Sequence, residues 1–95
     1  MEKYTSSAQI DLFEHLYQTE DQTVTHLQMK AGKEIGEHDT PFRAFIIPIK
    51  GKVSFSTPEK TVEIQPGDII HLEPMEPHWL SAIDDSDVMV VKVKA

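Results

Sequence analysis

The chain has 95 residues, which is enough for one domain with a single core. Acidic residues outnumber basic ones by 16 to 9 and the formal net charge is −7, so neither nucleic acid nor an anionic membrane is an expected partner. There is no cysteine, which excludes disulfides, thiolate metal sites and a cysteine nucleophile. The first residues lack the long apolar segment of a signal peptide, and a cytoplasmic location is therefore expected.

The first expected element is a short helix within a lead-in of residues 1–21. Between Ser6 and Gln18, apolar residues recur at spacings of three and four, as on one face of a helix; they are Ile10, Leu12, Phe13, Leu16 and Tyr17. Ser6 or Ser7 would supply the N-cap. His15 falls on this segment and is expected to be solvated. A helix this short needs a larger body to pack on.

Residues 22–94 show the pattern of short strands, and with the lead-in they are expected to form a single domain over residues 1–95. The stretches with strand character are QTVTHLQMKA, FRAFIIPI, KVSFS, TVEIQ, DIIHLE, HWLSAI and DVMVVKVK. Turn residues such as Lys50-Gly51 separate them. Seven or eight short strands at this spacing indicate an all-β fold, an antiparallel sandwich or barrel.

Two prolines lead to local expectations. Pro48 lies inside an apolar strand and cannot donate a hydrogen bond to a neighbouring strand, so an edge or a bulge is expected there. Pro66-Gly67 fits the two central positions of a type II turn, and such a turn requires a positive φ at Gly67.

The remaining histidines are the candidate site residues. His38 and His78 each stand at a junction between a loop and a strand, and such positions line the mouth of a barrel, where ligand sites tend to lie. The alternative is two unrelated polar residues on the rim. His26 lies in mid-strand among threonines and is expected to be exposed or hydrogen-bonded at a subunit contact. For His71, strand parity does not decide whether the side chain points inward.

Two groups of residues, in order along the chain, resemble the two motifs of the cupin superfamily: Gly32, His38, an apolar strand and Gly51, and then Gly67-Asp68, Ile69–Leu72 and Pro77-His78. Their separation is similar to that in small single-domain cupins of the conserved-barrel type, and the resemblance covers about residues 22–94. It implies a double-stranded β-helix, in which two facing antiparallel sheets roll into a barrel that is often dimeric.

The sequence departs from the family pattern at the metal ligands. The usual first motif has His-x-His followed by a glutamate, and the second motif supplies a fourth ligand. In this chain Thr40 stands at the place of the second histidine, and Ala44 or Phe45 falls at the place of the glutamate. Arg43, beside that place, is a cation and repels a divalent metal.

Of the four ligands that the resemblance implies, only His38 and His78 remain. A catalytic iron, manganese, nickel or zinc ion normally has at least three protein ligands, so the pair makes a weak or degenerate site. The candidates for a third ligand are His71, if it points inward, and Glu73.

Three functions are compatible with these residues. The first is binding of a small molecule in the barrel; the candidate ligand-binding residues are His38, Thr40, Phe42, His78 and Trp79. The second is a metal-dependent enzyme of the dioxygenase kind with His38 and His78 as ligands. The third is a metal-free isomerase or epimerase, in which a histidine acts as base and a carboxylate or tyrosine as acid. It is the weakest, because both tyrosines lie in the lead-in.

The lead-in also bears on oligomeric state. A barrel of this size cannot cover all the apolar residues between Tyr4 and Tyr17. In addition, exposed strand edges need to be paired or capped. A homodimer that exchanges this segment across a two-fold axis is therefore expected.

Overall fold

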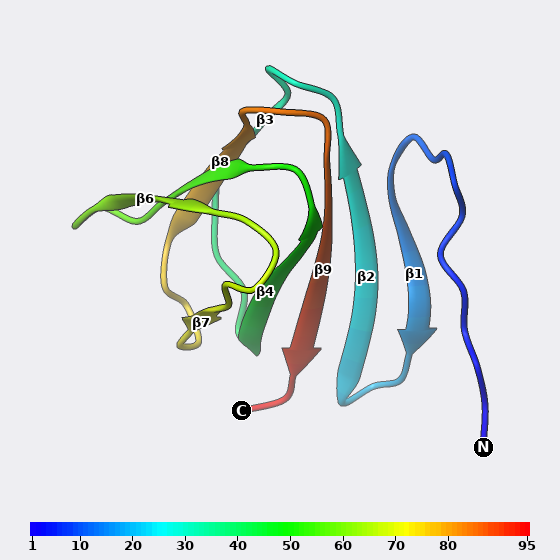
Figure 1. The fold of residues 1–95 in the computed structure, drawn as a ribbon. Coiled ribbons are helices and arrows are strands. Elements are labelled where there is room, and N and C mark those ends of the chain that lie inside the picture. Colours follow the sequence, from blue (N-terminus) through cyan, green and yellow to red (C-terminus); the bar gives the residue numbers. More distant parts are fainter.

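The computed structural model describes all 95 residues and contains nine strands (Figure 1). They are β1 (Leu12–Gln18), β2 (Gln22–Met29), β3 (Glu34–His38), β4 (Arg43–Lys50), β5 (Val53–Ser56), β6 (Thr61–Ile64), β7 (Ile70–Leu72), β8 (His78–Ala82) and β9 (Ser86–Val93). No element is a helix of the length and apolar character that a membrane span requires.

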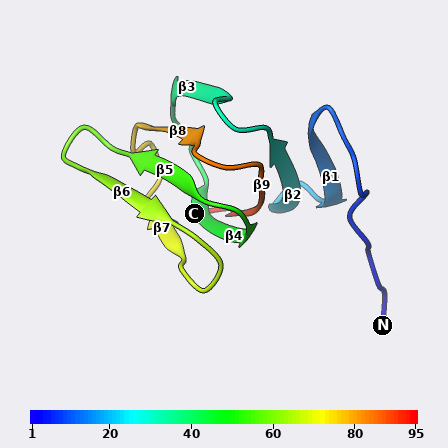
Figure 2. The same ribbon diagram turned by 45° about the horizontal axis from the view of Figure 1, so that its top comes forward.

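The strands form two sheets in which all pairs are antiparallel. One sheet has five strands in the order β1-β2-β9-β4-β7, and the other has four in the order β3-β8-β5-β6. The two sheets face each other, and β1 extends past the part of the larger sheet that the smaller one covers (Figures 1 and 2). This is the all-β antiparallel barrel that the sequence pattern predicts.

The core lies between the two sheets and follows from the alternation of side chains along each strand. On β5, Val53 and Phe55 are 0% and 2% exposed, and on β9, Val88 and Val90 are 0% and 8% exposed. Residues two apart on a strand point to the same face, so these pairs meet between the sheets. Eleven buried hydrophobic residues in all form this core.

The expected N-terminal helix is wrong, because the segment forms strand β1. Leu12, Glu14 and Leu16 are half-buried and the residues between them are exposed, which is the period of a strand. Over seven residues, the spacing of four between Leu12 and Leu16 fits one face of a strand as well as one face of a helix, and Phe13 and Tyr17, also four apart, are both exposed. The edge of β2 offers backbone partners from Gln28 to Thr23, whereas a helix this short has no comparable source of stability.

Both local expectations about the prolines are confirmed. The pairing of β4 with β9 shifts between Pro48 and Lys50, which is the expected bulge. Gly67 has a φ of 104°, and the amide of Asp68 donates to the carbonyl of Gln65 at 2.9 Å to close the turn. Strand β3, by contrast, was not expected, because its sequence EIGEH has a single apolar residue.

The expectation of an exposed His26 is also wrong, since this side chain is buried on the outer face of the larger sheet. Its Nδ1 lies 2.8 Å from Glu14 Oε2 on β1, and its Nε2 lies 2.6 Å from Asp87 Oδ1 on β9. The backbone amide of Ser7 donates to the same Glu14 oxygen at 2.8 Å. Gln28 accepts from the amide of Ile10 and donates to Asp87, so the N-terminal segment is tied to this cluster.

Protonation of His26 reflects the balance of burial and its two partners. Burial by itself lowers the pKa of an imidazole, but the hydrogen bonds to Glu14 and Asp87 outweigh it, and the pKa of His26 is raised. The hydrogen bond from His26 lowers the pKa of Glu14. The raised pKa favours the protonated imidazole, which can donate one hydrogen bond to each of the two half-buried carboxylates.

Candidate functional site

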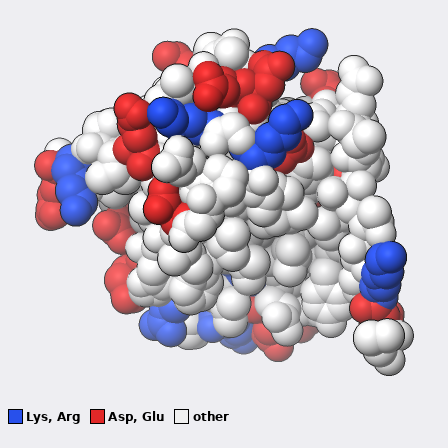
Figure 3. All heavy atoms as spheres, viewed as in Figure 1, with Lys and Arg blue, Asp and Glu red and all other residues white.

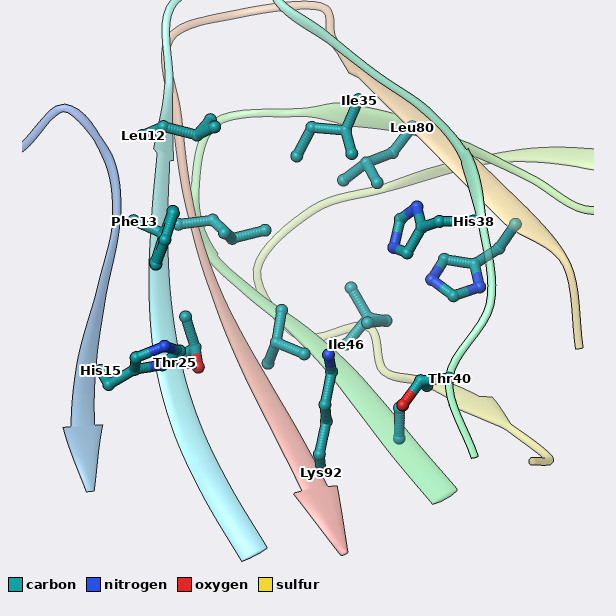
Figure 4. Close-up of a pocket in the computed structure, with 14 residues that line it drawn as sticks. Leu12, Phe13, His15, Thr25, Ile35, His38, Thr40, Ile46, Leu80 and Lys92 are labelled. Atoms are coloured by element: carbon teal, nitrogen blue, oxygen red, sulfur yellow. Dashed lines mark hydrogen bonds between the residues drawn. The ribbon is translucent and has the colours of Figure 1, made fainter. Parts of the chain in front are cut away.

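A cavity of about 350 Å³ lies between the two sheets and is lined by 14 residues, eight of them hydrophobic (Figure 4). The polar residues of the lining are His15, Thr25, His38, Thr40, His78 and Lys92. This volume is within the range of sites for small molecules, which typically combine an apolar wall with a few polar groups. The cavity is therefore the candidate functional site.

The position of His38 depends on a β-bulge in β3. Ile35 pairs with Leu80 and His38 pairs with His78, so three steps along β3 match two steps along β8. The extra residue reverses the alternation, and both Ile35 and His38 line the cavity. The carbonyl of Gly36, within the bulge, accepts a hydrogen bond from His38 Nδ1 at 2.9 Å. The bulge thus aims the ring and orients it.

His78 lies deeper, at the start of β8, and is 4% exposed. Its ring stacks on Phe55 with centroids 5.7 Å apart, and its Nδ1 donates to the carbonyl of Glu76 at 2.9 Å. Burial lowers the pKa of His78, and the nearby His38 and Lys92 lower it further, against the effect of the Glu76 carbonyl. His78 is therefore neutral at neutral pH.

The two imidazoles lie against each other, with ring centroids 4.1 Å apart and an interplanar angle of 61°. Each Nδ1 faces a backbone carbonyl, which can only accept, so each Nδ1 must carry a proton. In a neutral ring the lone pair is then on Nε2. When both rings are neutral, each can therefore accept a hydrogen bond from a ligand at its Nε2.

Thr40 lines the same cavity and is 8% exposed. Its Oγ1 accepts from the amide of Phe42 at 3.3 Å, and its carbonyl accepts from the amide of Met75 at 2.7 Å. The first bond closes a turn within the loop after β3, and the second joins that loop to the loop before β8. Figure 4 shows Thr40 on the same side of the cavity as His38, with His15 and Thr25 on the opposite side.

Four other candidates from the sequence do not line the cavity. Trp79 lies between the inward-facing His78 and Leu80, so alternation directs it to the other face of β8. Phe42 is half-buried in the loop before β4. His71 is 41% exposed, and its Nδ1 is 3.9 Å from Glu73, which is itself 64% exposed. Neither His71 nor Glu73 can complete a metal site in this arrangement.

Three polar residues of the lining were not expected from the sequence. His15 and Thr25 face each other across β1 and β2, with Nδ1 and Oγ1 2.8 Å apart. Their pairing could not be foreseen once the first segment was assigned to a helix. Lys92 follows Val88 and Val90 at intervals of two on β9, and this alternation was the available signal for its inward direction.

A model of the cupin domain matches residues 25–94. The chain belongs to the cupin superfamily. No curated protein matches it in sequence. The family assignment agrees with the facing antiparallel sheets and with the position of the cavity between them.

Several solved structures have the same fold as this chain. An RmlC-like cupin from Desulfovibrio desulfuricans has 18% identity and a TM-score of 0.85, over 98% of this chain and 96% of that one. A conserved protein of unknown function from Streptococcus pyogenes has 23% identity and a TM-score of 0.83, over 98% and 93%. A cupin superfamily protein from Desulfitobacterium hafniense has 11% identity and a TM-score of 0.84, over 88% and 77%. At these identities the likeness is one of fold.

The residues of this cupin fit a tightly held divalent metal poorly. The free Nε2 atoms of His38 and His78, each with its Nδ1 oriented by a carbonyl, resemble the arrangement of metal-bound histidines. However, no group of three or more His, Cys, Asp or Glu side chains is placed to hold an ion. The hydroxyl of Thr40 is a neutral oxygen and a weak ligand for iron or zinc.

Proposed function

We propose that this cupin binds a small organic molecule in the cavity between its sheets. The observation that carries the proposal is the cavity itself, with its volume of about 350 Å³ and eight apolar residues in its lining. The apolar wall would bury the body of the ligand, and each square ångström removed from water contributes about 25 cal/mol. The neighbouring Nε2 atoms would accept hydrogen bonds from a hydroxyl or N–H group.

The ligand would enter beside His38, which is exposed, and its polar group would reach His78 below. Because His78 is neutral and stacked on Phe55, its Nε2 is a fixed acceptor that does not have to reorganise when a ligand binds. A preorganised acceptor of this kind favours binding, since little side-chain freedom is lost.

A metal-dependent enzyme is the second candidate, and the two oriented Nε2 atoms favour it. The metal in that case would be held by His38 and His78 with solvent or substrate as the remaining ligands. The isomerase hypothesis is less favoured, because no carboxylate or tyrosine lines the cavity to act as the acid.

The proposal can be tested by protein-observed NMR with a panel of small phenols and anilines. We expect the perturbed amides to be those of residues around the cavity. In His38→Phe the mouth is filled and one acceptor is lost, so affinity should fall about three- to tenfold. His71→Phe is the matched control, because it makes the same change on the outer face of the larger sheet.

Two results would contradict the proposal. One is that no member of the panel perturbs the residues around the cavity at millimolar concentration. The other is that His38→Phe and His71→Phe weaken binding equally, which would place the ligand elsewhere or show a general loss of stability.

A further inference from the structure

The cavity contains one cation, Lys92. On β9 this residue pairs with Ala44 of β4 and Thr23 of β2, and it shares the inner face with Val88 and Val90. It is half-buried. In Figure 4 the side chain runs back along the cavity from the end of the strand, and its ammonium nitrogen is turned toward Ile46. The charge is thus directed between the sheets and not away from the end of the barrel.

No carboxylate of the protein forms an ion pair with this ammonium group. The lining contains neither aspartate nor glutamate, although the chain has 16 acidic residues against nine basic ones. Lys92 forms no ion pair, whereas Arg43 pairs with Glu73 at 3.7 Å and Lys94 pairs with Asp21 at 3.7 Å on the surface. An unpaired cation beside an apolar wall loses hydration without gaining a partner. Its charge can be compensated by an anion from outside.

We propose that Lys92 binds the anionic group of the ligand and that the ligand is a compact organic monocarboxylate. This inference rests on the proposed function. A single ammonium group matches a single carboxylate, and the eight apolar lining residues match a hydrocarbon or aromatic body. At the other polar position, His38 and His78 present acceptors, so the ligand carries a hydroxyl or N–H donor there.

The contrasting explanation is that Lys92 only covers the open end of the core with its aliphatic stem. Long basic side chains often do so while their charge stays in water. Under that explanation the charge has no part in binding. A carboxylate and its uncharged amide would then bind alike.

The test compares para-hydroxyphenylacetate with para-hydroxyphenylacetamide, and para-hydroxybenzoate with para-hydroxybenzamide, at neutral pH. The protein is the wild type, Lys92→Met and Lys94→Met, with affinities taken from NMR titrations. Lys92→Met keeps most of the stem and removes the charge. Lys94→Met removes an equal charge two residues along, outside the cavity.

We expect the wild type and Lys94→Met to bind each carboxylate about tenfold more tightly than its amide, which is the effect of one hydrogen bond to a charged group. Lys92→Met should bind each carboxylate and its amide with equal affinity. Its affinity for the amides should equal that of the wild type. Equal binding of carboxylates and amides by the wild type would overturn the role of Lys92 and leave the proposed function standing. Equal loss of carboxylate and amide binding in Lys92→Met would show that the substitution disturbs the cavity as a whole, and it would overturn the role of the Lys92 charge. Failure of the wild type to bind any of the four compounds would contradict the proposed function itself.

Discussion

At the scale of single residues, the candidate site contains a pair of histidines whose surroundings determine their chemistry. Backbone carbonyls orient both rings, and burial and neighbouring charge keep His78 neutral. Thr40 lies beside them with a hydroxyl that already accepts from the amide of Phe42. The pair therefore offers acceptors to a ligand but too few donor atoms to hold a metal firmly.

Restoring a third imidazole tests this explanation. Thr40→His should raise the affinity for nickel or zinc by at least about tenfold, because each additional good ligand adds substantial binding energy. Titration calorimetry on the wild type and the variant measures the difference. If the wild type already binds nickel or zinc at nanomolar concentration, the absence of a histidine at position 40 does not weaken the metal site. Another group must then supply the third ligand.

The triad of Glu14, His26 and Asp87 predicts a pH dependence of stability. The pKa of His26 is raised above its ordinary 6.5, so its contribution is complete below that value and is lost as the pH rises through the raised pKa. The pKa of Glu14 is lowered below its ordinary 4.5, so its contribution is present above 4.5 and is lost as the pH falls through the lowered pKa. The triad is most stabilising between these limits.

Residue-resolved NMR should show His26 titrating above 6.5. A variant with both Glu14→Gln and Asp87→Asn is the control. There only burial acts strongly on the imidazole, so the pKa of His26 should fall below the ordinary value. The melting temperature of the wild type should decrease through the alkaline transition of His26, and this decrease should vanish in the control. If the melting temperature depended on pH identically in both proteins, the assignment of the alkaline transition to His26 would be refuted.

At the scale of elements, turns and bulges place the side chains that the strands carry. The bulge in β3 turns His38 inward, and the bulge in β4 accommodates Pro48. Gly51 and Gly67 both have positive φ, at 82° and 104°. Their surroundings differ, since a Cβ at Gly51 would overlap the backbone of Asp85 and the side chain of Ser86, whereas a Cβ at Gly67 would meet nothing.

The two glycines should therefore respond unequally to substitution. Gly67→Ala should reduce the free energy of unfolding by about 1 kcal/mol, from backbone strain alone. Gly51→Ala adds steric overlap and should cost about 3 kcal/mol or more. Thermal denaturation can separate these values, because 1 kcal/mol corresponds to roughly 4–8 °C for a domain of this size. Equal losses would show that the overlap at Gly51 is relieved at no cost.

At the scale of the whole molecule, the larger sheet is wider than the smaller one. On the face shown in Figure 3, acidic and basic side chains interleave around the periphery, and the centre is largely uncharged. Strand β1 lies past the cover of the second sheet, and its Phe13 and Tyr17 are 53% and 36% exposed. Tyr4 is 50% exposed and packs its ring edge-on to Tyr17 at 5.7 Å.

These exposed aromatic residues support the expectation of a homodimer that covers β1. Light scattering after gel filtration should give a mass of about twice 10.8 kDa at micromolar concentration. Tyr17→Glu places a charge on this surface and should shift the equilibrium toward the monomer. Ile69→Glu is the control, because Ile69 is 59% exposed but lies outside β1. This variant should have the same mass as the wild type. A wild-type mass of 10.8 kDa would contradict the dimer.

The sequence by itself determined the fold of the barrel, because hydrophobic alternation and turn residues act locally. Val53 and Phe55 alternate with serines, and Pro66-Gly67 permits few conformations, so such signals can be interpreted without knowledge of the rest of the chain. The departure from the ligand pattern that the family resemblance implies was also visible, because Thr40 stands where that pattern has a second histidine. That His38 lies at the mouth of the barrel could also be expected, although the bulge that turns it toward the cavity could not.

Only the tertiary structure decided which residues meet across strands. The segment around Phe13 fits a helix and a strand equally over its short length, and the free edge of β2 selects the strand. His26 is buried because Glu14 and Asp87, from two other strands, approach its two nitrogens. Lys92 lines the cavity because the opposite sheet encloses its face of β9, and that sheet supplies no carboxylate to the lining. These are contacts between residues distant in sequence, and the free energy of each depends on neighbours that the local pattern does not specify.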